Sequence, residues 1–162
     1  MTTIERAERN DLQEILDLQY LAYRSEAELF NDFRIPPLTQ TLEEVREEFE
    51  RSVFLKATDG SGKIIGSVRA HTDGRTLFIG KLIVHPQRQG NGIGTEMLES
   101  IEKEYPPMRR ELFTSCKSVK NLALYRRQGY RPFREEETYP GMRFVFLEKF
   151  PREKDSLPYT GR

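Results

Sequence analysis

The segment of residues 76–104 constrains the fold most strongly, because three local patterns follow one another in it without a break. Residues 76–85 are nearly all apolar, as in a central strand that is covered on both faces. Glycines then stand at alternate positions, Gly90, Gly92 and Gly94. The apolar stripe of the amphipathic helix that follows consists of Ile93, Met97, Leu98, Ile101 and Tyr105. A strand, a glycine turn and a helix in this order predict a β-α unit within an α/β domain.

Hydrophobic periodicity and capping residues locate the other elements. Thr41 and Glu44 form a capping-box pair that predicts a helix start, Gly129 predicts a helix end, and Asp73-Gly74 predicts a two-residue hairpin. We expect strands at about residues 2–8, 52–58, 63–72, 76–85, 111–116, 130–137 and 142–150, and helices at about 12–27, 41–50, 91–104 and 118–129. The order β-α-α-β-β-β-α-β-α-β-β predicts a single α/β domain with a mixed sheet over residues 1–150, followed by a polar C-terminal tail at 151–162.

The composition excludes several classes of partner. Lys+Arg and Asp+Glu are both 26, so the formal net charge is zero and a broad electrostatic grip on nucleic acid or membrane is not expected. Cys116 is the one cysteine of the sequence, which fits a reducing cytoplasmic setting. The first twenty residues are too charged for a signal peptide, and no apolar run of about 18 residues is present. No Cys/His/acid spacing indicates a metal site.

The glycine turn and the start of the following helix together favour an anion. The first N–H groups of a helix have no partner within the helix, and the macrodipole adds partial positive charge there. A nucleoside-triphosphate loop is excluded because Gly94 is followed by Thr95 and Glu96 instead of lysine. The G-x-G-x-G spacing is also a poor fit to a dinucleotide fingerprint. A turn that needs glycine only for its geometry is the alternative.

Two motifs carry a family resemblance. The first is Gln89-x-x-Gly92-x-Gly94 within "LIVHPQRQGNGIGTEML", and the second is "SVKNLALYRRQGY" at Ser118–Tyr130. With these motifs the chain resembles the GNAT superfamily of acyl-CoA-dependent N-acetyltransferases over about residues 2–149. The resemblance implies a single-domain, GNAT-like, mixed and mostly antiparallel sheet flanked by helices.

The resemblance also implies acetyl-CoA as cosubstrate and no metal. The backbone around the glycine turn would bind the pyrophosphate, with residues Gln89, Gly90, Asn91, Gly92, Ile93, Gly94 and Thr95. Leu82, Ile83 and Val84 would offer backbone groups to the pantetheine arm, as an added strand does. Relatives often carry Asn at the position of Ser118, where it contacts the arm. Ser118 either keeps that contact or caps its helix, and Asn121 is the candidate to take the contact over.

Acetyl transfer to an amine needs a group that takes a proton from the ammonium and one that protonates the leaving thiolate. Tyr125 stands where the family carries its general acid, and packing as a helix aromatic is the alternative. Many relatives place a glutamate base at the position of Phe78, so the sequence names no base. Gly80, two residues further on, predicts a bulge in this strand. Weaker candidates for the base are His71, His85, Glu26, Asp32 and Glu135–Glu137, besides a water relay.

The sequence therefore predicts an N-acetyltransferase that moves an acetyl group from acetyl-CoA to a primary amine by direct attack in a ternary complex. The acceptor is a small molecule or a peptide, and its class stays open. The alternative is a non-catalytic sensor or regulatory module that binds CoA or acyl-CoA, which the phenylalanine at position 78 favours. Another acyl donor is also compatible. We expect no nucleic-acid or membrane partner, and a homodimer is possible through the closing strands.

Overall fold

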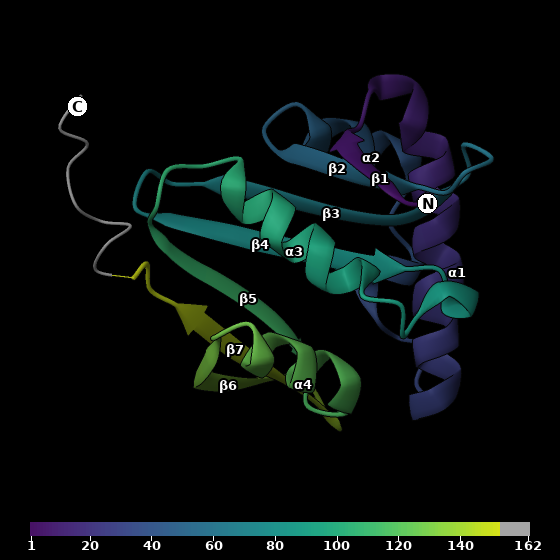
Figure 1. The fold of residues 1–162 in the computed structure, drawn as a ribbon. Helices are drawn as coiled ribbons and strands as arrows, with labels where there is room; N and C mark the ends of the chain where they lie inside the picture. Colours follow the sequence, from purple (N-terminus) through teal and green to yellow (C-terminus); the bar gives the residue numbers. More distant parts are fainter. Residues whose placement is uncertain (153–162) are drawn as a thin grey trace, which may run out of the picture. The chain divides into compact units, whose positions relative to one another are not determined.

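The computed structural model describes residues 1–152. Its helices are α1 (Leu12–Phe30), α2 (Leu42–Phe49), α3 (Ile93–Lys103) and α4 (Val119–Arg127). Its strands are β1 (Thr3–Arg6), β2 (Val53–Thr58), β3 (Ile64–Thr72), β4 (Thr76–Val84), β5 (Arg109–Ser115), β6 (Arg131–Tyr139) and β7 (Met142–Lys149) (Figure 1). Apart from short 3₁₀ turns, this is the order that the sequence predicted. The predicted tail lies, from residue 153 onward, outside the described residues.

The strands are hydrogen-bonded in the order β1-β2-β3-β4-β5-β7-β6. The pairs β1–β2, β2–β3, β5–β7 and β6–β7 are antiparallel, and β4–β5 is parallel. The predicted mixed, mostly antiparallel sheet flanked by helices is therefore confirmed. The chain divides into two compact units, one of residues 1–71 and 79–101 and the other of residues 72–78 and 102 onward, so β4 contributes to both.

The first unit holds the larger apolar cluster. Residues of α1 and α2 pack there against strand residues Phe54, Ile64 and Ile83. Helix α3 lies in front of β3 and β4 (Figure 1). Its contact with β3 is close: a Cβ built on Gly66 would stand 2.8 Å from the Sδ of Met97. A glycine is required here by the approach of the helix to the strand.

Local signals explain where the helices of this unit begin and end. Thr41 caps α2, because its Oγ1 accepts from the N–H of Glu44 at 3.2 Å and the Glu44 carboxylate accepts from the N–H of Thr41 at 3.0 Å. The predicted capping box is confirmed. Helix α1 runs three residues beyond its predicted end at Ala27 and stops at Asn31, which takes the left-handed conformation with φ 54°.

The second unit is built on β5. Its parallel ladder with the first residues of β4 pairs Thr76 with Arg109 and Phe78 with Glu111. Strand β7 lies on the other side of β5, and β6 forms the sheet edge and is exposed along nearly its whole length. The end of β3 at residue 72 and the start of β4 at 76 agree with the predicted strand bounds, and the loop of residues 73–75 is one residue longer than the two-residue hairpin that Asp73-Gly74 indicated.

A buried carboxylate ties the second unit together. The hydroxyl of Tyr130, a residue that is 1 % exposed, donates to Glu102 Oε2 at 2.6 Å. The Nζ of Lys149 lies 3.2 Å from the same oxygen. Burial, followed by the neighbouring Glu102 charge, raises the pKa of Tyr130 well above its usual range. The phenol is therefore a permanent hydrogen-bond donor, and its role is structural.

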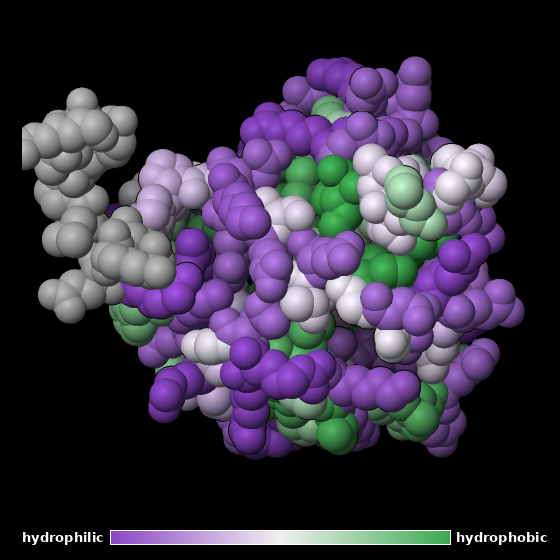
Figure 2. All heavy atoms as spheres, viewed as in Figure 1, coloured by the Kyte–Doolittle hydropathy of each residue, from purple (hydrophilic) through white to green (hydrophobic). Residues whose placement is uncertain are grey.

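Hydrophilic side chains cover most of the face seen in Figure 2, and apolar side chains form separate patches on it. Among the described residues, no helix combines the length and the apolar character needed to cross a lipid bilayer.

Candidate functional site

The glycine turn connects β4 to α3 within the first unit. The N–H of His85 donates to the carbonyl of Ile65 at 2.8 Å, which fixes the start of the turn to β3. Gly90 and Gly92 both take left-handed conformations, with φ +83° and +80°. Helix α3 begins directly afterwards at Ile93. The turn therefore depends on glycine at two positions to deliver the chain into the helix.

The surroundings of the turn are open. A Cβ built on Gly90 or Gly92 would meet no atom within 4 Å. The side chains of Gln89 and Asn91 fold back onto the turn, because their amide nitrogens reach the carbonyls of Val84 at 3.5 Å and Arg88 at 3.1 Å. The first backbone N–H groups of α3 have no acceptor within the helix. An anion can therefore approach the backbone here without displacing a side chain.

Two charged residues flank this turn in the sequence. Glu96, the acid that follows Thr95, is exposed. Arg88 adds a positive charge beside the turn, and its guanidinium pairs with Asp59 at 3.0 Å. The predicted pantetheine segment, Leu82–Val84, precedes the turn in β4.

Strand β4 carries an irregularity next to this segment. Lys81 has φ +43°, a left-handed conformation that is rare for a residue with a side chain. The sequence drew attention to Gly80 instead, which is not among the positive-φ glycines. Strained backbone of this kind persists where the surrounding structure enforces it, and it occurs often at functional sites.

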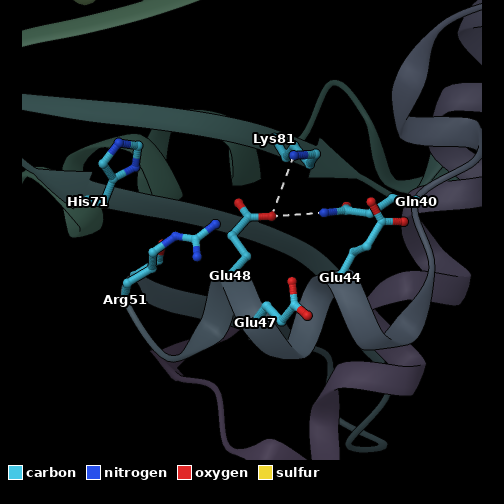
Figure 3. Close-up of a pocket in the computed structure, with 8 residues that line it drawn as sticks. Gln40, Glu44, Glu47, Glu48, Arg51, His71 and Lys81 are labelled. Atoms are coloured by element: carbon cyan, nitrogen blue, oxygen red, sulfur yellow. Dashed lines mark hydrogen bonds and ion pairs between the residues drawn. The ribbon is translucent and has the colours of Figure 1, made fainter.

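A solvent-open hollow of about 280 Å³ lies between α2 and strands β3 and β4 in the same unit. Its lining is polar or charged throughout, and Figure 3 shows the side chain of Glu48 at its centre. The residues that line it are Gln40, Glu44, Glu47, Glu48, Arg51, Ser52, His71 and Lys81. The sequence identified none of them as site residues except His71, because His71 and Lys81 meet the residues in and around α2 only in the folded chain.

A buried arginine fixes the position of the Glu48 carboxylate. Arg69 is 2 % exposed, and its guanidinium donates to Glu48 Oε1 at 2.8 Å and to Gln19 Oε1 at 2.8 Å. Gln40 Nε2 donates to the same Glu48 oxygen at 2.9 Å, and Lys81 Nζ lies 3.6 Å from it (Figure 3). This network joins α1, α2, β3 and β4.

The network shifts the pKa values of its members. Burial raises the pKa of Glu48, but the charges of Arg69 and Lys81 and the hydrogen bond from Gln40 outweigh it and hold the pKa below its usual value. Burial, and then the Arg69 charge, lowers the pKa of Lys81 despite the nearby Glu48. Glu48 is therefore ionised at neutral pH.

The second unit carries the other predicted site residues. Tyr125 is the buried residue of α4, 5 % exposed, and its ring lies 6.1 Å from that of Tyr130. Ser118 occupies the N-cap position without a side-chain cap bond, so the capping interpretation was wrong. Asn121 Nδ2 donates to Thr114 Oγ1 at 3.3 Å.

The ladder between β4 and β5 reveals a carboxylate, that of Glu111, which was not among the candidates from the sequence. Glu111 pairs with Phe78, so both residues lie on one face of the sheet in adjacent strands. Its carboxylate accepts from Arg109 NH1 at 2.9 Å, and Arg109 Nε also donates to Glu148 at 2.9 Å. Glu111 could not be found from the sequence because the sequence does not show the register between the two strands.

The mixed sheet, the glycine turn at the start of α3 and the order of elements define an acyltransferase class of α/β protein. Residues 10–130 match the family model described as "Acetyltransferase (GNAT) family". The match covers well over half of the chain, so the chain belongs to the GNAT acetyltransferase family. The resemblance seen in the sequence is thereby confirmed.

Comparisons with individual proteins agree on the fold. The Escherichia coli ribosomal-protein-S18-alanine N-acetyltransferase is similar with a TM-score of 0.76 at 18% identity, over 100% of this chain and 99% of that one. The Thermoplasma acidophilum PaiA N-acetyltransferase, solved with coenzyme A, gives a TM-score of 0.72 at 16% identity, over 93% and 99%. The "UPF0157 protein YqkA" of Bacillus subtilis (strain 168) is 24% identical over 93% of this chain, which spans 43% of that protein's length.

Proposed function

We propose that the protein transfers an acetyl group from acetyl-CoA to a primary amine by direct attack in a ternary complex. The acceptor nitrogen forms a bond to the acetyl carbon while the thioester C–S bond breaks. The ammonium proton passes to a base, and the thiolate of coenzyme A receives a proton from an acid. The observation that carries the proposal is the open glycine turn at the start of α3 in a member of the GNAT family.

The turn is the proposed pyrophosphate site. Backbone N–H groups of Gln89–Thr95 would bind the phosphate oxygens, and the helix macrodipole would add to the attraction. Leu82–Val84 would bind the pantetheine arm through backbone hydrogen bonds. The proposal keeps Ser118 and Asn121 as further contacts to this arm. One neighbour of the same fold was solved with coenzyme A, which supports this choice of ligand. Among the described residues no cluster of His, Cys, Asp or Glu suits a metal ion.

Tyr125 is the proposed general acid, since a phenol and a thiol have pKa values close enough for proton exchange. The proposed base is Glu111, which lies across the ladder from Phe78 and pairs with Arg109 at 2.9 Å. Tyr125→Phe and Glu111→Gln should each lower kcat by at least about tenfold while acetyl-CoA binding stays unchanged. If Glu111→Gln retains full kcat, the base lies elsewhere.

The first experiment is calorimetric titration of acetyl-CoA into the native protein and into Gly92→Glu. The new carboxylate would occupy the phosphate position and repel the ligand. Gly74→Glu is the matched control, because Gly74 also has a positive φ, of +97°, and open space around its Cα. Binding by the native protein and the control, together with loss in Gly92→Glu, supports the proposal. Equal binding by all three proteins contradicts it.

The second candidate is a sensor that binds acyl-CoA without turnover, and the phenylalanine at position 78 favours it. The two candidates differ in one product. With a suitable amine an enzyme releases coenzyme A thiol continuously, whereas a sensor releases none with any amine. The proposal also includes a cytoplasmic location, for which the single cysteine of the sequence is the support.

A further inference from the structure

The hollow beside Glu48 lies next to the β4 segment that is proposed to bind the pantetheine arm, within the first unit. The glycine turn, proposed for the pyrophosphate, follows β4, and Leu82–Val84 are proposed for the pantetheine arm. Reading back along the strand from the turn therefore leads away from the phosphates and toward the thioester. The next residue in that direction is Lys81, which lines the hollow. A molecule in the hollow would thus approach the reacting end of the cofactor.

The two cations next to Glu48 share its single carboxylate. Arg69 and Lys81 both use the carboxylate of Glu48, at 2.8 Å and 3.6 Å. Within residues 1–152, Glu48 is the one carboxylate that forms an ion pair with either cation. Arg69 is the closer partner and is fully buried, so the unmatched charge belongs to Lys81, whose side chain is 27% exposed. An exposed cation of this kind suits an anionic group of a ligand.

On the side of α2, the rim of the hollow carries two carboxylates. Glu44 and Glu47 line it from α2, and both are exposed. In Figure 3 their carboxylates lie on the helix side, across the hollow from the strand that carries Lys81. Arg51 lies on the far side of Glu48 from Lys81 and Gln40. The hollow therefore offers a cation, Lys81, on the strand side and two carboxylates on the side of α2.

We propose that this hollow binds the acceptor, and that the acceptor is a zwitterion whose amine stands next to a carboxylate, such as an amino acid. The inference rests on the proposed function. The ligand's carboxylate pairs with Lys81, and its ammonium is attracted by the carboxylates of the rim. A polyamine is disfavoured because its positive charges would be repelled by Lys81. A dianion is disfavoured because its second negative charge would be repelled by Glu44 and Glu47.

The test measures release of coenzyme A thiol from acetyl-CoA with three sets of amines: the standard L-amino acids, their carboxamides, and spermidine. The carboxamides keep the amine and lose the negative charge. We expect turnover with at least one amino acid and a kcat/KM that is at least about tenfold lower for its carboxamide. Equal rates for acid and carboxamide, or turnover of spermidine alone, overturn the inference.

Lys81 is tested with two variants. Lys81→Met should remove the preference for the acid over the carboxamide, chiefly by raising KM for the acid. Lys81→Arg keeps the charge and should retain the preference. Lys103→Met is the control, because Lys103 is an exposed lysine outside the hollow. If Lys81→Met keeps the full preference, the carboxylate binds elsewhere and the inference is wrong.

Calorimetry with acetyl-CoA separates the two levels of the proposal. If acetyl-CoA binds but no amino acid is acetylated, the acceptor inference is overturned and the cofactor site stands. If acetyl-CoA does not bind, the proposed function fails, and the acceptor inference fails with it. Unchanged acetyl-CoA binding by Lys81→Met would show that the variant is folded.

Discussion

Replacing Glu48 by Gln should destabilise the protein substantially, because it leaves a buried guanidinium without a carboxylate. Arg69 is 2 % exposed, and Glu48 is its one paired carboxylate among the described residues. Removing one partner of a buried ion pair costs about 3–5 kcal/mol. The Glu48 side chain is 23% exposed, so water compensates in part. We therefore expect the free energy of unfolding to fall by about 2–4 kcal/mol.

Urea unfolding followed by circular dichroism at pH 7 measures this loss. Arg69→Met and the double variant complete a thermodynamic cycle. The double variant should be more stable than the sum of the single losses predicts, because it buries no unmatched charge. A loss below about 0.5 kcal/mol for Glu48→Gln, or strict additivity in the cycle, would refute the reasoning.

The loss of stability in Glu48→Gln should depend on pH. The folded-state pKa of Glu48 lies below the usual value of 4.5, so the folded protein favours the ionised form. A depressed pKa contributes stability that is fully present above the unfolded value and is lost as the pH falls through the folded value. The stability difference between wild type and Glu48→Gln should therefore be largest above pH 4.5 and shrink below it.

Two further predictions concern packing and a turn. Gly66→Ala should destabilise by about 1–3 kcal/mol, because the new Cβ would stand 2.8 Å from the Sδ of Met97, whereas Gly80→Ala, with no atom within 4 Å, should be nearly neutral in urea unfolding. Equal effects of the two changes would contradict the packing argument. The pKa of Asp59 is lowered to about 2, chiefly by the Ser61 hydroxyl, so ¹³C NMR of its carboxyl should show a midpoint near that value. A midpoint at the usual value of 3.8 would show that the turn does not stabilise the ionised carboxylate.

The order of elements followed from the sequence because its signals are local. The capping box of Thr41 and Glu44 lies within four residues, and the glycines of the turn act through their own backbone. Family membership followed for the same reason, since both motifs are short. The length of α1 was less predictable, because the residue that ends it, Asn31, is not the glycine that usually marks a helix end.

Features that depend on distant partners could not be predicted. Arg69 reads as an ordinary strand residue, and its partners Gln19 and Glu48 are 50 and 21 residues away. The sequence pattern of α4 does not show which side is buried, since the apolar Val119 is 73% exposed while Tyr125 is 5% exposed. Which face of a short helix is buried is decided by its neighbours in the fold.

The glycine turn has a consequence for how this protein tolerates variation. At Gly90 and Gly92 there is room for a side chain, so crowding by the protein itself does not exclude larger residues. The backbone conformation, with φ near +80° at both positions, is what disfavours residues with a side chain. In a saturation library selected for folding alone, asparagine should be the most frequent survivor at both positions, because it adopts the left-handed region most readily after glycine. Under selection for acyl-CoA binding, asparagine should disappear as well wherever the ligand occupies that open space.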